Sequence, residues 1–229
     1  MKITWTFTEH EVADVRDVVN TQIARNRPTV QQRQSRNIDL PWTSNITQES
    51  LWHALVLGFV TTQQASGTGS NVSQFMEAKP FTLTYAACKE VEALGGISSL
   101  ESFVNDTLLR VKVGRRKKVV PAVIDAIKRL EAGEWVAYKR YADQLLSQRL
   151  QSCTTTHYQL EREAAEYLLV FKEIGPKQSR NIWQYLGLTR YAGVFDSRVT
   201  QWLRSQLSSD LVVLNASVLM ENRFRPGGM

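Results

Sequence analysis

The stretch from Lys172 to Val199 constrains the fold most, because it combines a helix end, a tight turn, a second helix and the start of a third. An apolar helical run ends just before it, and Gly175 and Pro176 then interrupt the periodicity. We expect Gly175 to adopt a backbone angle that other residues resist, and Pro176 to occupy the first helical turn. Gly187 is placed to stop this helix. Asp196 precedes a new apolar pattern, which predicts an N-cap.

This stretch resembles the hairpin of the helix-hairpin-helix DNA glycosylases, which typically reads leucine-proline-glycine-apolar-glycine-x-lysine and is followed by a catalytic aspartate. By this resemblance Ile174, Gly175 and Pro176 belong to a hairpin that grips DNA. Lys177 falls on the lysine that bifunctional members use as a nucleophile. Asp196, nineteen positions later, falls on the catalytic aspartate, and the 8-oxoguanine branch of the family has this spacing.

Two positions depart from the family pattern. Glu173 stands where the hairpin has its first glycine, and a carboxylate near a phosphate would repel it, so the grip on DNA is expected to be weaker or reshaped. Asn181 stands where the eukaryotic-type 8-oxoguanine enzymes have a cysteine in the base pocket. Asn181 is therefore a base-pocket candidate, and the identity of the excised base stays open.

The chemistry implied by the resemblance needs these two residue types. A lysine amine attacks C1′ of the nucleotide, expels the base and forms a Schiff base that can eliminate the phosphate. The amine must be unprotonated, so Lys177 is expected in a dry or cationic pocket. Asp196 would stabilise the positive charge that grows on the sugar. Each residue alone has a simpler interpretation, because surface lysines and N-cap aspartates are common.

The segment that follows Thr47 is apolar on nearly all sides and predicts a buried core helix. It runs into a polar segment that contains Gln63 and Gln64. In the family, a side chain from this segment enters the duplex and fills the gap left by the extruded nucleotide. Gln63 and Gln64 are the candidates for this wedge. The alternative is that both merely end the helix before a Gly/Ser loop.

A basic turn lies farther along the chain. Six cations and no acidic residue lie between Arg110 and Lys118, with Gly114 at the predicted turn. Backbone amides of such a turn and its cations can hold phosphates. The candidates for DNA contact are Gly114, Arg115, Arg116, Lys117 and Lys118. The alternative is a solvated run of charge.

Composition agrees with a polyanionic partner. The chain has 229 residues, a net charge of +6 and a pI near 9.4, which suits double-stranded DNA. Cys88 and Cys153 are far apart, which indicates a reducing compartment. The three histidines have no metal-ligand spacing, and the cysteine cluster of endonuclease-III-like members is absent, so we expect no metal, iron–sulfur cluster or other cofactor. The first residues, MKITWTF, lack the long apolar run of a secretion signal, and the longest apolar stretch, Ala54 to Val60, is too short to span a membrane, so we expect neither feature.

The predicted fold is all-α, with two helical lobes and a DNA-binding cleft between them. We expect residues 1–46 to form a helix and a loop from Pro28 onwards, residues 47–150 a lobe with the wedge and the basic turn, and residues 151–229 the hairpin lobe. Trp42, in the predicted loop, is a candidate to stack on the flipped base. The four tryptophans on predicted helical faces (Trp52, Trp135, Trp183 and Trp202) are expected in the core.

The function predicted by the resemblance is a monomeric DNA glycosylase with lyase activity. A damaged base similar to 8-oxoguanine is the favoured substrate. The expected location is the cytoplasm, in association with the nucleoid, or the nucleus if the source is eukaryotic. Two alternatives stay open: a glycosylase that acts on hypermodified bases of phage DNA as a defence, and a non-catalytic helix-hairpin-helix protein that only binds DNA.

Overall fold

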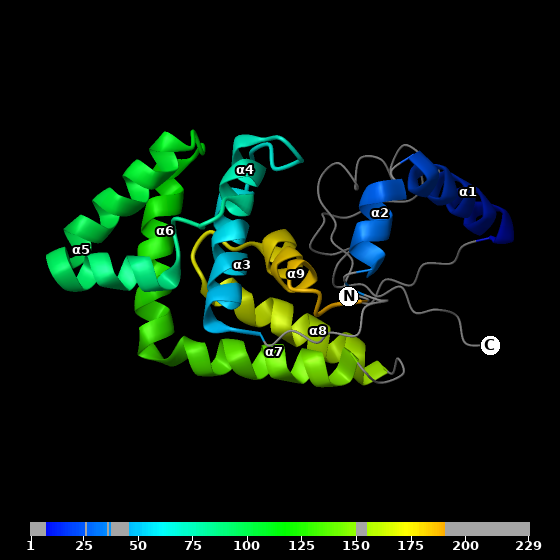
Figure 1. The fold of residues 1–229 in the computed structure, drawn as a ribbon. Helices are drawn as coiled ribbons and strands as arrows, with labels where there is room; N and C mark the ends of the chain where they lie inside the picture. The colour runs from blue at the N-terminus through cyan, green and yellow to red at the C-terminus, as the bar shows by residue number, and fades with distance from the viewer. Residues whose placement is uncertain (1–7, 26, 36, 38–45, 150–154, 191–229) are drawn as a thin grey trace. The chain divides into compact units, whose positions relative to one another are not determined.

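The computed structural model describes residues 8–25, 27–35, 37, 46–149 and 155–190. All regular secondary structure within these ranges is helical, which confirms the all-α prediction (Figure 1). The chain divides into two compact units, one made of Met1–Leu40 with Gly193–Met229 and the other of Pro41–Ala192. No helix among the described residues is long and apolar enough to cross a membrane.

The described part of the first unit contains helices α1 (Glu9–Arg25) and α2 (Arg27–Gln34). The predicted loop from Pro28 is therefore wrong over the length of α2. Pro28 is the second residue of this helix, and a proline is tolerated in the first turn because the N–H it lacks has no intrahelical acceptor there. The sequence of α2 is polar and lacks a regular apolar face, so hydrophobic periodicity does not predict this helix.

The second unit is built around α3 (Gln48–Val60). The other helices of this unit are α4 (Asn71–Glu77), α5 (Tyr85–Arg110), α6 (Arg116–Arg129), α7 (Trp135–Arg149), α8 (Thr155–Tyr167) and α9 (Pro176–Tyr185). Helix α3 packs against α4, α5, α6, α7 and α9. It lies between α6 and α9, near the centre of this unit (Figure 1). The prediction of a central core helix is confirmed.

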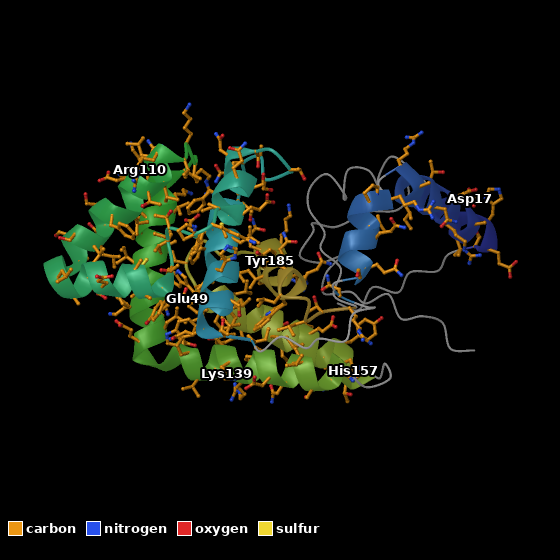
Figure 2. All side chains as sticks on the ribbon, in the orientation of Figure 1. Asp17, Glu49, Arg110, Lys139, His157 and Tyr185 are labelled. Atoms are coloured by element: carbon orange, nitrogen blue, oxygen red, sulfur yellow. The ribbon has the colours of Figure 1, made fainter. Side chains whose placement is uncertain are left out.

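Thr47 begins α3 as its N-cap, as predicted. Its side-chain oxygen accepts a hydrogen bond from the Ser50 backbone N–H at 3.1 Å, and the Ser50 hydroxyl accepts one from the Thr47 N–H at 3.0 Å. This reciprocal pair satisfies two donors that the helix start leaves open. Glu49 in the first turn (labelled in Figure 2) accepts hydrogen bonds from the backbone N–H groups of Tyr85 and Ala86, both at 3.0 Å, and so also fixes the start of α5.

An aromatic cluster joins α3, α7, α8 and α9. Tyr138 is fully buried, its ring lies 5.2 Å from that of Trp183, and its hydroxyl donates to the Leu51 carbonyl at 3.1 Å. Burial raises the pKa of Tyr138 well above its usual value. The indole N–H of Trp183 donates to the Ala164 carbonyl at 2.8 Å. Trp52 and Trp183 are completely buried, as predicted, whereas Trp135 is half-buried.

Glycines with positive φ lie where the helices kink or end. Gly96, with φ of 69°, kinks α5, and Gly133, with φ of 121°, lies in the short π-helical segment Leu130–Glu134 before α7. Gly187, with φ of 73°, ends α9. The N–H groups of Gly187 and Leu188 bond back to the carbonyls of Gln184 and Trp183, at 3.1 and 3.0 Å. This bonding closes the helix in the manner typical of a left-handed C-terminal glycine.

Helices α3 and α9 approach each other closely at Gly58. A Cβ atom built on Gly58 would lie 2.8 Å from Cδ1 of Ile182 and 2.9 Å from Cδ1 of Ile174. Both isoleucines are buried, so neither side chain has free space into which to move. The absence of a side chain at Gly58 therefore sets the distance between the core helix and the helix that follows the hairpin.

Candidate nucleic-acid interface

Three segments that are far apart in the sequence meet in the second unit. They are the residues that follow the end of α3 (residues 61–64), the basic turn (residues 111–118) and the hairpin with the first turn of α9 (residues 173–178). We call them together the three-loop surface. Direct hydrogen bonds between side chains and neighbouring segments hold them side by side.

Gln64 links the end of α3 to the basic turn. Its amide nitrogen donates to the Val60 carbonyl, and its amide oxygen accepts the backbone N–H of Gly114 at 2.8 Å. A Cβ atom on Gly114 would lie 2.9 Å from that amide oxygen, so a glycine permits this approach. Gln64 is half-buried and serves the fold here, whereas its neighbour Gln63 is exposed. Of the two wedge candidates, Gln63 is the accessible one.

Arg115 links all three segments. One terminal nitrogen of its guanidinium donates to the Thr62 carbonyl at 3.3 Å, and the other donates to the Glu173 carboxylate at 3.1 Å. The Arg115 and Glu173 side chains are 20% and 23% exposed, so the ion pair is partly shielded from water. The negative charge of Glu173 in the hairpin is thus neutralised by Arg115, a cation of the basic turn.

Gln178 links the hairpin helix to the end of α3. Its amide nitrogen donates to the hydroxyl oxygens of Thr61 and Thr62, at 3.3 and 2.9 Å. Its amide oxygen accepts a hydrogen bond from Asn181 at 3.2 Å. Asn181, the base-pocket candidate, is half-buried and bonds within α9. No sequence pattern predicts this role of Gln178, because its partners lie more than a hundred residues away in the chain.

Backbone strain concentrates on this surface. Within the described residues, every non-glycine residue with positive φ belongs to one of the three segments: Gln63 (54°), Lys112 (55°), Arg115 (55°) and Glu173 (65°). The left-handed region costs a non-glycine residue about 1–2 kcal/mol. Conformations of this kind gather at binding and active sites, where the surrounding structure imposes them. The strain therefore marks the three-loop surface independently of its charge.

The hairpin differs from its prediction in one respect. Gly175 has φ of −95° and ψ of 176°, an extended conformation that any residue adopts, so the expectation of an unusual angle there is wrong. Glu173 takes the left-handed angle instead. A Cβ atom on Gly175 would meet no neighbour, so its backbone is open to an incoming molecule. Pro176 occupies the first position of α9, as predicted.

Lys177 is the second residue of α9 and is half-buried beside the hairpin. Ile174, also a predicted hairpin contact, is buried and packs toward Gly58 of α3. The hairpin thus has one residue anchored in the core, while Gly175, Pro176 and Lys177 stay at least partly accessible. This arrangement fixes the position of the Lys177 backbone relative to α3.

The predicted phosphate ligands of the basic turn divide into two groups. Arg115 is occupied as described, and half-buried Arg116 donates to the Val113 carbonyl at 3.4 Å. Lys117 and Lys118 are exposed. Lys112, which is not among the predicted phosphate ligands, is also exposed and follows the end of α5 in the left-handed conformation. Helices commonly end at a left-handed residue, which is usually a glycine. The helical pattern before Lys112 has no glycine at its end, so a non-glycine residue had to take this conformation, and this was the signal available in the sequence.

A histidine–tyrosine pair joins α3 and α9 away from the hairpin, and sequence reasoning missed it. Nε2 of His53 lies 2.9 Å from the Met76 carbonyl, and Nδ1 lies 3.2 Å from the Tyr185 hydroxyl (Tyr185 is labelled in Figure 2). Because a carbonyl only accepts, Nε2 carries the proton and Nδ1 accepts from Tyr185. Burial lowers the pKa of His53, so the neutral ring is favoured.

Two predicted site residues, Trp42 and the catalytic candidate Asp196, lie outside the described residues. Among the residues that are described, no group of three or more His, Cys, Asp or Glu side chains is arranged to hold a metal ion. Cys88 is buried, and burial raises its thiol pKa to about 12. Comparisons of the chain with protein-family models, curated proteins and solved structures find no match.

Proposed function

We propose that this protein is a DNA glycosylase that flips a damaged or modified base out of the duplex and excises it, with a lesion similar to 8-oxoguanine as the favoured substrate. The observation that supports this most is the meeting of the wedge candidate Gln63, the basic turn and the Lys177 hairpin on one strained surface. Three segments that the sequence resemblance assigns to DNA contact are thus adjacent in space, although they are far apart in the chain.

In the proposed mechanism, DNA crosses the three-loop surface. Lys117, Lys118 and the open backbone at Gly175 contact phosphates, and Gln63 fills the gap that the flipped nucleotide leaves. The nitrogen lone pair of Lys177 attacks C1′, the bond from C1′ to the base breaks, and the base leaves with one of the two amine protons. The other amine proton passes to O4′ as the bond from C1′ to O4′ breaks, which gives a Schiff base. Loss of a proton from C2′ then breaks the bond to the 3′ phosphate, which leaves.

Asp196 is proposed to stabilise the positive charge that develops on the sugar while the bond to the base lengthens. An aspartate at a helix start can also act only as an N-cap. Asp196→Asn separates the two roles, because asparagine caps about as well but carries no charge. We expect this variant to keep its melting temperature and to lose about two orders of magnitude or more in excision rate.

Borohydride trapping tests the proposal directly. Wild-type protein is incubated with a panel of duplexes that carry different lesions and with phage DNAs that carry hypermodified bases. The expected result is a covalent protein–DNA adduct with wild type and none with Lys177→Ala. Excision without an adduct would make water the nucleophile. Excision from the phage DNAs alone would assign the enzyme to defence. Binding without excision of any base would leave a non-catalytic DNA-binding protein.

A further inference from the structure

The ion pair between Arg115 and Glu173 uses a cation of the proposed DNA surface. Arg115 begins α6 without a side-chain cap, and Glu173 belongs to the hairpin. Both residues adopt left-handed backbone angles, 55° and 65°, and their side chains meet at 3.1 Å. A non-glycine residue disfavours this left-handed backbone conformation. The ion pair therefore joins two strained positions, on two segments that both face the proposed ligand.

A carboxylate and a phosphate make equivalent demands on an arginine. Each offers two oxygens to the fork of guanidinium donors, and both carry negative charge. While Glu173 occupies Arg115, the pair has no net charge and adds little attraction for a polyanion. The carboxylate also repels a phosphate that approaches the open backbone at Gly175. Glu173 therefore both blocks a cation and opposes the incoming ligand.

We propose that Glu173 is an internal substitute for a DNA phosphate at Arg115, and that DNA binding exchanges the carboxylate for a phosphate. This inference rests on the proposed function and adds a regulation of the same surface. Glu173 limits the affinity for undamaged DNA, because every encounter must break the ion pair before Arg115 can hold the backbone. The contact of Arg115 with the Thr62 carbonyl keeps the guanidinium in place during the exchange.

Glu173→Gln tests the exchange, because glutamine keeps the shape of the side chain and removes its charge. Binding of a short labelled undamaged duplex is measured over a range of salt concentrations. We expect the variant to bind about three- to tenfold more tightly at low salt, with a salt dependence steeper by about one phosphate contact. A melting curve establishes that the variant is folded. Should it fail to fold, Glu173→Gly replaces it, since glycine accepts the left-handed angle.

Two controls separate the exchange from a general effect of charge. Asp125→Asn, on α6, removes one negative charge from another ion pair, Asp125 with Arg129 at 2.7 Å, and should tighten binding much less. In an Arg115→Gln background, Glu173→Gln should still relieve the repulsion of phosphate by the carboxylate, but it should no longer steepen the salt dependence by one phosphate contact, because the cation that it releases is absent.

The possible failures are distinguishable. If wild type binds DNA but Glu173→Gln binds equally or more weakly, or gains no more than Asp125→Asn, the exchange is overturned and the proposed function stands. A salt dependence that Glu173→Gln steepens equally without Arg115 also overturns it. If neither wild type nor variant binds any duplex, the proposed function fails and the exchange fails with it.

Discussion

The core around α3 and the three-loop surface are built by different rules, although α9 contributes residues to both and the surface begins where α3 ends. In the core, the buried polar groups of Trp52, Tyr138 and Trp183 each donate to a backbone carbonyl. On the three-loop surface, four non-glycine residues are left-handed, and polar side chains hold the segments together. Packing thus provides stability in one region, which allows the other to hold strained, charged groups in fixed positions.

The comparison predicts that the largest losses of stability come from the core. Trp183→Ala removes a fully buried indole and the donor to the Ala164 carbonyl, and we expect the free energy of unfolding to fall by about 3–5 kcal/mol. Denaturant titration measures this loss. As a control, Val136→Ala on α7, where the side chain is 76% exposed, should change stability by less than about 0.5 kcal/mol. Equal effects of the two substitutions would contradict the assignment of stability to this cluster.

A matched pair of glycines tests where the two regions meet. Gly58→Ala forces a methyl group against Ile174 and Ile182, and we expect a loss of about 1–3 kcal/mol together with weaker duplex binding, because α9 must shift. Gly175→Ala adds the same methyl group into open space. It should leave the melting temperature nearly unchanged and weaken binding alone. If Gly175→Ala binds a duplex as wild type does, the hairpin backbone is not in contact with DNA.

The smallest predicted effect has the opposite sign. Lys112→Gly replaces a left-handed lysine with the residue that accepts this angle, and we expect stability to rise by up to about 1 kcal/mol. The same change at Lys139, in the middle of α7, should lower it by about 1 kcal/mol. Thermal melting of both variants measures the difference. A loss at both positions would show that Lys112 is not strained, and the contrast between core and surface would weaken.

How far the sequence predicts this molecule depends on whether the determining interaction is local. Thr47 and Gly187 were predictable as helix ends, because a cap needs only its own neighbours in the chain. Helix α2 was not, because its polar sequence lacks the apolar spacing that reveals a helix. Gly175 was assigned an unusual angle on residue type alone, whereas Glu173 adopts that angle.

The candidate site was predicted as separate segments, and its assembly could not be. Gln63, the basic turn and Lys177 carry recognisable residue types, but no pattern in the sequence indicates that Arg115 reaches Glu173. Nor does one indicate that the side-chain oxygen of Gln64 accepts a hydrogen bond from the backbone N–H of Gly114. Such pairs depend on how α3, α6 and α9 dock, and docking is set by the whole core.

The links across the three-loop surface join residues that are 50, 53, 58 and 116 positions apart in the chain. Contacts between such distant residues form only when the intervening chain has already been ordered, because the loss of chain entropy precedes the gain from the contact. The surface therefore does not exist in a nascent or partly unfolded chain. Such a chain carries all the same cations but cannot hold them in this arrangement, so the proposed engagement of a duplex would be a property of the completed fold alone.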